Sequence, residues 1–191
     1  MTAGVTVYDV EIVHLLASPL HRYEGRPADG PLPAPAGVDE SRESIEVRAG
    51  LGIVGDRFFG RSAAHRTAAV TVMAVESLEW VQQALGVASP FPLAAPRRNI
   101  LLRGVDVDAL RGQEFSLDSG EGEVLFQGHR PASPCGWMNV VLAEGAHKAL
   151  RGRGGVRVEP LSSGTLRVGS AVLRSRASVA RRPELVQPPL A

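Results

Sequence analysis

The sequence predicts a mainly β fold, a barrel with a few short helices. Many short runs of apolar and β-branched residues are separated by glycine-rich turns, and only two stretches have helical spacing. Strands and helices do not alternate along the chain, which favours an all-β domain. Closing the sheet into a barrel would remove its exposed edges, so a barrel is the architecture we expect.

The strands are predicted from alternation and from β-branched content. Residues 5–16 form the longest such stretch, and His14 within it is expected to pack on the sheet. Residues 105–113 are expected to be a polar connection. Further strands are predicted at residues 44–48, 69–73, 96–104, 114–117, 124–127, 156–161, 165–168 and 171–173.

The clearest helix is predicted over residues 75–85, where apolar residues recur at helical spacing until Gly86 supplies a stop. Residues 139–150 also have a helical pattern. Residues 18–43 are rich in Pro, Gly and charged residues and predict an irregular loop, which could partly cover a pocket. The tail at 175–191 has no periodicity and is expected to be loosely held.

Composition narrows the range of functions. With 191 residues, of which 44% are hydrophobic and 21% charged, the chain is large enough for one good core, so we expect a single domain over residues 1–191. A net charge of +1 gives no case for nucleic acid or an acidic membrane as a partner. Nearly all the positive charge is arginine, which suits anion recognition, although codon usage is the preferred explanation.

The cysteine and lysine counts exclude some chemistry. One cysteine cannot form an internal disulfide, the N-terminus has no signal-peptide pattern and no apolar run is long enough to span a bilayer. We therefore expect a cytoplasmic protein. Lys148 is the only lysine and would have to carry any pyridoxal phosphate, but its helix-like setting between Arg and Gly residues argues against that role.

The most informative stretch is residues 128–137, which holds the only cysteine. Two prolines restrict the backbone, so this segment is predicted to be a stiffened loop between a strand and the start of a helix. His129 and Arg130 precede Cys135, and such a cationic setting can lower a thiol pKa and make the thiolate a nucleophile or a soft metal ligand. The alternative is a small buried apolar residue.

Two other stretches combine arginine with residues suited to ligand binding. Residues 50–60 place four glycines around Asp56 and Arg57, which form either a turn with a surface ion pair or a ligand-orienting pair. Arg98 and Asn99 stand at the entrance to a predicted strand. They could hold a phosphate or carboxylate, or could simply be solvated.

Taken in order, these motifs resemble the MOSC domain family, which is named after the C-terminal part of molybdenum cofactor sulfurases. The matching segments are residues 52–57, which carry the family's G-x-x-G-D-R signature, residues 98–106, 110–113 and 130–131 leading to Cys135, and residues 152–156 and 164–169. The resemblance covers roughly residues 44–174, and the order and spacing of its motifs are more specific than any one of them alone.

The resemblance implies a MOSC-type β-barrel in which Cys135 holds sulfur or ligates the molybdenum of a pterin cofactor. Two departures are visible. Ala132 and Ser133 separate the two prolines, a longer spacing than the commonest pattern, and the chain lacks the desulfurase module of full-length sulfurases. Without that module the chain cannot by itself generate persulfide sulfur from cysteine. It also has no cysteine pattern for an iron–sulfur domain.

Three functions follow as expectations. In the first, the protein binds molybdenum cofactor (molybdopterin) through Cys135 and reduces small N-hydroxylated or related N-oxygenated compounds, with electrons from a separate reductase. In the second, Cys135 carries persulfide sulfur from a cysteine desulfurase, or holds the cofactor for delivery. In the third, the domain is catalytically silent and its cysteine is buried.

The resemblance also assigns expected roles around Cys135. Arg57, Arg98, Asn99 and Arg130 are the candidates for holding the cofactor phosphate, and His129 is expected to line the same pocket. Asp56 belongs to the same site, where we expect it to support the structure by accepting backbone N–H bonds in its own turn.

Overall fold

The computed structural model describes residues 4–34 and 36–181. Its strands are β1 (Thr6–Leu16), β2 (Ser41–Arg42), β3 (Ser44–Arg48), β4 (Gly52–Ile53), β5 (Val70–Ala74), β6 (Ile100–Arg103), β7 (Glu114–Asp118), β8 (Glu123–Pro131), β9 (Val156–Pro160), β10 (Gly164–Arg167) and β11 (Gly169–Ser175). Its α-helices are α1 (Val75–Ala84), α2 (Trp137–Val141) and α3 (Ala146–Ala149), and its 3-10 helices are η1 (Pro27–Asp29), η2 (Ala63–Ala68) and η3 (Val107–Leu110).

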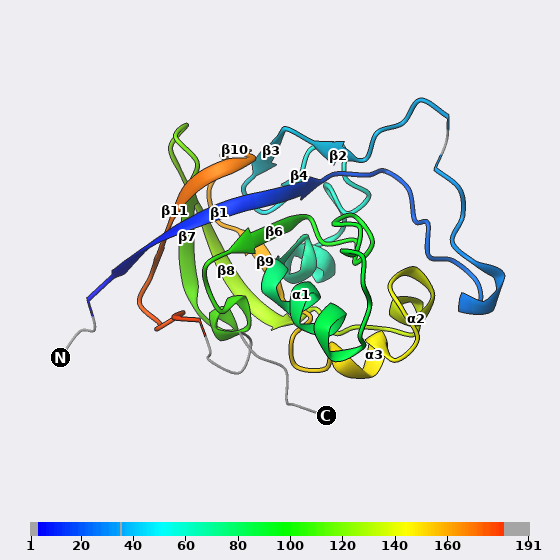
Figure 1. Cartoon of the computed structure of the whole chain (residues 1–191). Helices are drawn as coiled ribbons and strands as arrows, with labels where there is room; N and C mark the ends of the chain where they lie inside the picture. Colours follow the sequence, from blue (N-terminus) through cyan, green and yellow to red (C-terminus); the bar gives the residue numbers. More distant parts are fainter. Residues whose placement is uncertain (1–3, 35, 182–191) are drawn as a thin grey trace.

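Within the described residues, seven strands close into a barrel in the order β11-β7-β8-β9-β5-β6-β1, and β1 pairs back onto β11 (Figure 1). Neighbouring strands are antiparallel except β5 and β6, which run parallel. β2 pairs with the end of β1, while β10, β3 and β4 form a separate small sheet. The predicted mainly β barrel is confirmed.

Alternating side chains fill the barrel. On β9, Val156 and Val158 are fully buried while Arg157 between them faces outward and is only half-buried. Phe115 and Phe126 stack across β7 and β8 with ring centroids 5.4 Å apart. This alternation is what places a charged side chain such as that of Arg157 on the outer surface of the barrel.

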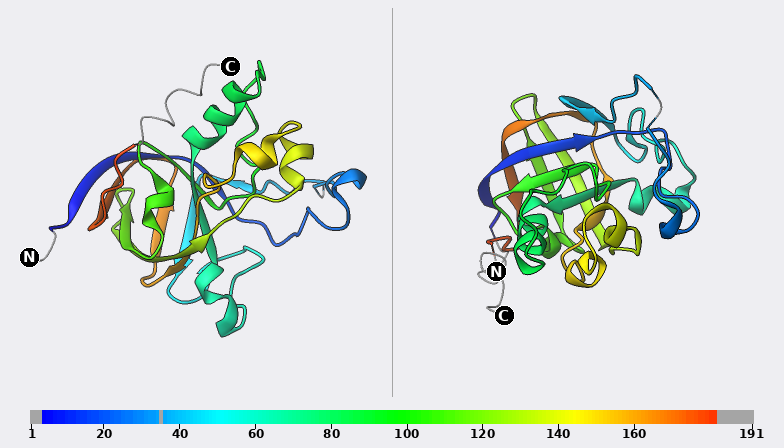
Figure 2. Two further views of the ribbon diagram at one scale, coloured as in Figure 1. Left: turned by 90° about the horizontal axis from the view of Figure 1, so that it is seen from below. Right: turned by 45° about the vertical axis from the view of Figure 1, so that its right-hand side comes forward.

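A second apolar cluster joins the three α-helices to the outside of the barrel. It contains Met73 and Leu101 from the barrel, Leu78 from α1, Trp137 from α2 and Leu150 after α3. Figure 2 shows the three helices gathered on one side of the barrel. None of the helices in residues 4–34 and 36–181 has the length and apolar character needed to cross a membrane.

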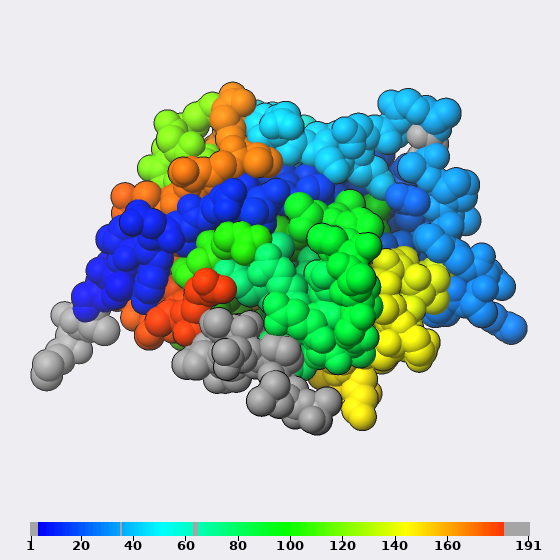
Figure 3. Space-filling model, in the orientation of Figure 1, coloured from blue at the N-terminus to red at the C-terminus, as the bar shows by residue number. Residues whose placement is uncertain are grey.

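The segment 18–43 is irregular, as predicted, apart from η1 and β2. It leaves the end of β1, packs η1 against α2, and returns to the barrel through β2 (Figures 1 and 3). η1 and α2 therefore lie side by side although more than a hundred residues separate them in the sequence.

Three predicted boundaries are wrong. β8 continues to Pro131, so residues 128–131 belong to a strand; a bulge between Gly128 and Pro131 in the pairing with β9 accommodates the proline. The helix predicted over residues 139–150 is divided into α2 and α3 by Gly145, whose φ of 90° is a left-handed conformation that favours glycine.

The stretch 105–113, predicted to be a polar connection, contains η3, whose Val107 and Leu110 are fully buried. The tail is also better held than predicted. Val179 is fully buried and its carbonyl accepts a hydrogen bond of 2.9 Å from the Asp106 amide. The prediction for residues 182–191 lies outside the described part of the chain.

Gly128 offers a test of this packing. A Cβ there would lie 2.0 Å from the carbonyl oxygen of Leu110, which is backbone and cannot move aside cheaply. We expect Gly128→Ala to cost about 1–3 kcal/mol of stability, or roughly 3–10 °C in melting temperature. Gly136→Ala is the control, since its Cβ would make only an ordinary 3.6 Å contact. Equal melting temperatures for the two variants would contradict the packing described.

Candidate functional site

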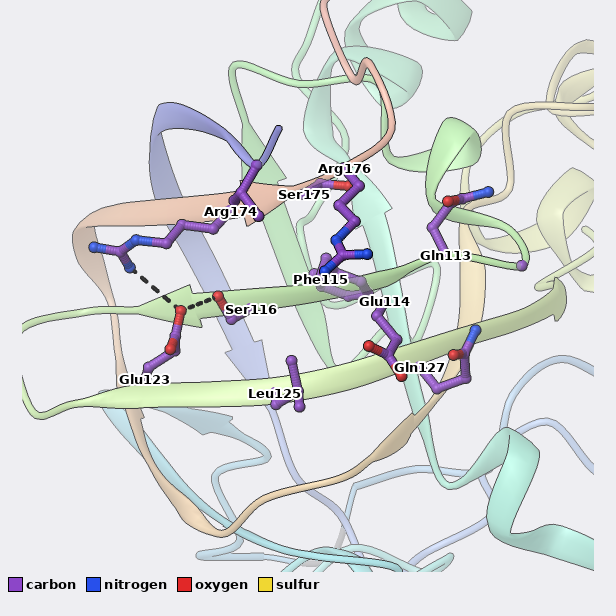
Figure 4. A pocket seen from close by; sticks show the side chains of 12 residues that line it. Gln113, Glu114, Phe115, Ser116, Glu123, Leu125, Gln127, Arg174, Ser175 and Arg176 are labelled. Carbon is purple, nitrogen blue, oxygen red and sulfur yellow. Dashed lines mark hydrogen bonds and ion pairs between the residues drawn. The ribbon is translucent and has the colours of Figure 1, made fainter. Parts of the chain in front are cut away.

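A groove of about 530 Å³ lies on the outer face of β7, β8 and β11 (Figure 4). Its Arg174 and Glu123 pair with each other at 3.5 Å, and Ser116 also hydrogen-bonds Glu123. Gly112 and Gln113 of the matching segment 110–113 lie in its wall, but none of the candidate site residues does. Its size alone does not make it the candidate site.

Five of the predicted site residues line two adjoining cavities instead: Asp56, Arg57, Arg98, Asn99 and Cys135. The two cavities share four arginines, Arg57, Arg97, Arg98 and Arg157. The cavity that we call the outer chamber has a volume of about 210 Å³, and Cys135 lies in its wall. The inner chamber has a volume of about 90 Å³, and Asp56 and Asn99 line it. The four arginines therefore lie between Cys135 in the outer chamber and Asn99, which directly precedes β6, in the inner chamber.

Arg98 is held by backbone carbonyls. Its Nε donates to Gly154 O at 3.0 Å, its Nη1 to Pro96 O at 2.9 Å and its Nη2 to Ala132 O at 2.7 Å. Burial lowers the pKa of Arg98 to about 10, and the neighbouring Arg157 acts in the same direction. The guanidinium group is thus fixed in direction by neutral acceptors, and the nearby Asp108 carboxylate acts on its pKa against the effect of burial.

Arg57 and Arg157 line both chambers as well. Burial lowers the pKa of Arg57 to about 10, and Arg97, Arg61 and Arg157 add to the shift. Burial also lowers the pKa of Arg157, with a contribution from Arg130. Arg57 lies 4.6 Å from the centre of the adjacent Phe58 ring. In the part of the chain that the structure describes, the charges that act on the pKa values of Arg57 and Arg157 are all those of other arginines.

Such an arrangement favours an anion. A partly buried cation is costly when no opposite charge lies beside it, and neighbouring cations raise that cost. A ligand with a phosphate or another oxyanion would relieve it and could accept paired guanidinium hydrogen bonds.

Arg97, by contrast, has its own counter-charge. Its Nη1 and Nη2 each lie 2.9 Å from one carboxylate oxygen of Glu40, and its φ of 52° is a left-handed conformation that is rare outside glycine. Glu40 also accepts from Arg22 at 3.0 Å and from the Ser18 hydroxyl. This cluster ties both ends of the 18–43 loop to the entrance of β6.

Asp56 and Asn99 form a buried structural link. The Asn99 amide donates to Asp56 Oδ2 and Leu16 O, each at 3.1 Å, and accepts from Thr71 N at 3.0 Å and Thr71 Oγ1 at 2.8 Å. All four of its hydrogen-bonding positions are therefore used. Both residues line the inner chamber, but Asn99 serves to join β1, β5 and β6.

Asp56 is equally occupied. Its Oδ1 accepts from Phe58 N at 3.0 Å, within its own turn, and its Oδ2 accepts from Ser18 N at 3.3 Å as well as from Asn99. Burial raises the pKa of Asp56 against the effect of these hydrogen bonds. Its contacts are those of a residue that shapes the loop around Arg57.

Cys135 is exposed at the outer chamber. The cysteine is therefore not the small buried apolar residue that the third expectation assumed. Tyr23 from the loop stacks on Trp137 with ring centroids 5.2 Å apart, and its hydroxyl donates to Ala95 O at 2.5 Å. The stacked pair forms a fixed wall beside the thiol.

The structure does not bring His129 and Arg130 into either chamber. Because β8 continues past them, their side chains follow the strand: His129 Nε2 lies 3.2 Å from Glu159 on β9, and Arg130 is exposed. Arg130 is near enough to influence the pKa of Arg157 but does not line the cavity. The expectation that these two residues face the same pocket as the cysteine is corrected here.

Sequence reasoning missed several lining residues. Arg157 alternates with valines on a strand, so it reads as an ordinary outward-facing residue. His21 and Tyr23 belong to an irregular loop without any periodic pattern. Only the arginine-rich composition hinted at Arg157, and no local signal marked the other two.

Comparison with known proteins gives a family and a fold. The family model described as MOSC domain matches residues 56–173. The chain is similar to the crystal structure of the YuaD protein from Bacillus subtilis, with a TM-score of 0.63 and 15% identity over 94% of this chain and 99% of that one. It is also similar to YiiM from Escherichia coli, with a TM-score of 0.53 and 17% identity over 93% and 71% of the two chains. The comparison with curated proteins gives no match.

The ion pairs of Glu40 make the stability of the fold depend on pH in the acidic range. Burial works to raise the pKa of Glu40, but hydrogen bonds from Arg97, Ser18 and Arg22 outweigh it and lower the pKa from 4.5 to about 2. A carboxyl with a depressed pKa stabilises the fold fully above its ordinary value, and that contribution is lost as the pH falls from 4.5 towards 2. The shift corresponds to a contribution on the order of 3 kcal/mol.

We therefore expect the Glu40→Gln variant to melt at a lower temperature than wild type at pH 7. Between pH 4.5 and 2, the melting temperature of the variant should fall less than that of wild type. Thermal unfolding across that range measures both effects. Glu24→Gln, an exposed change in the same loop, is the control. Identical acid dependence in wild type and Glu40→Gln would show that the cluster contributes nothing.

Proposed function

The chain belongs to the MOSC domain family, and from that membership and the geometry of the two chambers we propose that it binds a molybdenum cofactor with Cys135 as the protein ligand of the metal. The family is associated with this cofactor. We further propose that the loaded protein reduces small N-hydroxylated or related N-oxygenated compounds, with electrons from a separate reductase.

The observation that carries the proposal is the convergence of Arg57, Arg98 and Arg157 on a cavity whose wall holds an exposed thiol. Molybdopterin carries a phosphate, and guanidinium groups bind such an oxyanion through charge-assisted bonds. A thiolate is a soft ligand of the kind that suits a metal with sulfur neighbours. The arginines of the cavity therefore suit the phosphate of the cofactor, and the thiol suits its metal.

When bound, the cofactor supplies a metal centre able to exchange two electrons with a substrate. The chain's own residues hold and orient it. Arg98, fixed by three carbonyls, presents its guanidinium in a set direction. The stacked rings of Tyr23 and Trp137 line the same chamber and would border the bound cofactor on the loop side.

One observation also favours the alternative role. Because Cys135 is exposed, a partner such as a cysteine desulfurase could reach its sulfur, and the protein would then carry persulfide or deliver the cofactor. The two roles differ in whether the loaded protein turns over a substrate.

Cofactor content tests the binding proposal. Protein produced in a host that makes molybdenum cofactor should contain molybdenum and pterin, measured by metal and pterin mass spectrometry. Cys135→Ser should lose the metal, since serine is a hard and far less acidic ligand. Arg157→Ala should retain about ten- to a hundredfold less cofactor. Arg167→Ala, which removes an exposed arginine on β10, is the matched control.

Wild-type molybdenum content in Cys135→Ser would refute the ligand assignment. Turnover then separates the two roles: loaded protein with reduced methyl viologen should convert an N-hydroxylated purine base to the amine. A persulfide on Cys135 with no such turnover would favour the carrier role.

A further inference from the structure

The proposed reduction consumes protons as well as electrons. An N-hydroxylated amine, R–NH–OH, takes two electrons from the reductase and two protons to give R–NH₂ and H₂O. The N–O bond breaks, one proton completes the leaving water and the other joins nitrogen. A side chain at the chamber that delivers the proton to the leaving oxygen would speed this step by general acid catalysis.

Most of the side chains that line the chambers cannot fill this role. Arginine does not release its proton under ordinary conditions. Both oxygens of Asp56 accept hydrogen bonds, and the residue lies in the inner chamber. Tyr23 donates its hydroxyl proton to Ala95 O, and burial raises its pKa. Cys135 is the proposed metal ligand.

The Thr71 hydroxyl donates to Asn99, and a serine hydroxyl such as that of Ser133 is a far weaker acid than an imidazolium. His21 remains, and its ring can carry a proton on each nitrogen. It lines the outer chamber together with Cys135. Its Nδ1 lies 3.2 Å from Glu24 Oε1, which leaves Nε2 without a partner among the described residues. The side chain is 47% exposed, so it can be reprotonated from solvent.

The neighbours of His21 hold its backbone in place. Arg22 donates from Nε to Leu32 O at 2.8 Å and from Nη1 to Glu40 at 3.0 Å. Tyr23 stacks on Trp137. Arg22 and Tyr23, which follow His21, therefore anchor the backbone that carries its exposed imidazole. A proton donor needs such a fixed position beside its substrate.

From these contacts we propose that His21 is the catalytic proton donor to the leaving oxygen and that Glu24 is its positioning residue. The proposal rests on the proposed reductase function. A carboxylate that accepts from Nδ1–H leaves Nε2 to carry the second proton of the imidazolium. When Nε2 gives up that proton, the neutral ring keeps its hydrogen on Nδ1, where Glu24 accepts it.

The test uses cofactor-loaded protein with reduced methyl viologen and an N-hydroxylated purine base. We expect His21→Ala to lower kcat about a hundredfold, with KM and molybdenum content close to wild type. Added imidazole should restore part of the rate, which a merely structural role would not allow. Glu24→Gln should lower kcat about tenfold. His65→Ala is the matched control, because His65 is also exposed and contacts a residue three positions away.

A second readout does not depend on turnover. In ¹⁵N NMR of the loaded, oxidised protein, the base should shift the Nε2 signal of His21 and leave that of His65 unchanged. Wild-type kcat in His21→Ala would overturn the assignment while the reductase function stands. A loss of kcat that imidazole does not restore, together with lost molybdenum, would also overturn it. If wild type itself holds molybdenum but reduces no N-hydroxylated base, the reductase function fails and the assignment fails with it.

Discussion

The paired contact between Arg97 and Glu40 is the interaction on which the rest of the site depends. Two bonds of 2.9 Å join the entrance of β6 to the end of the 18–43 loop, and they hold Arg97 in a left-handed backbone conformation. Such a conformation costs energy for a residue with a side chain, so it persists only where surrounding contacts stabilise it. With this pair in place, the loop stands beside α2 and closes one wall of the outer chamber.

Arg97 has a carboxylate partner, and this distinguishes it from the other arginines that line the cavity. Glu40 pairs with both Arg97 and Arg22, whereas the charges that act on Arg57 and Arg157 at the chambers are those of other arginines. If these arginines served the fold alone, buried carboxylates beside them would lower the cost of their charge. Their arrangement is understood more simply as a binding site for the anionic part of a ligand, next to a thiol that can hold a metal.

The sequence was sufficient for the barrel and for the part of the site that lies in motifs. The alternation in residues 5–16 predicts β1 closely because one face of that strand packs on the core. Cys135 and Arg57 were found because each sits in a compact motif that resembles a known family. Arg157 and His21 were missed because only tertiary packing brings them to the cysteine. The extent of β8 was misjudged because a bulge, which no local rule predicts, allows Pro131 into the sheet.

The most direct test of the central claim is the position of the metal. Crystals of the cofactor-loaded protein, measured at the molybdenum absorption edge, should show one anomalous peak in the outer chamber within bonding distance of Cys135 Sγ, with the cofactor phosphate among Arg57, Arg98 and Arg157. A peak elsewhere, or a cofactor whose phosphate lies away from these arginines, would contradict the account.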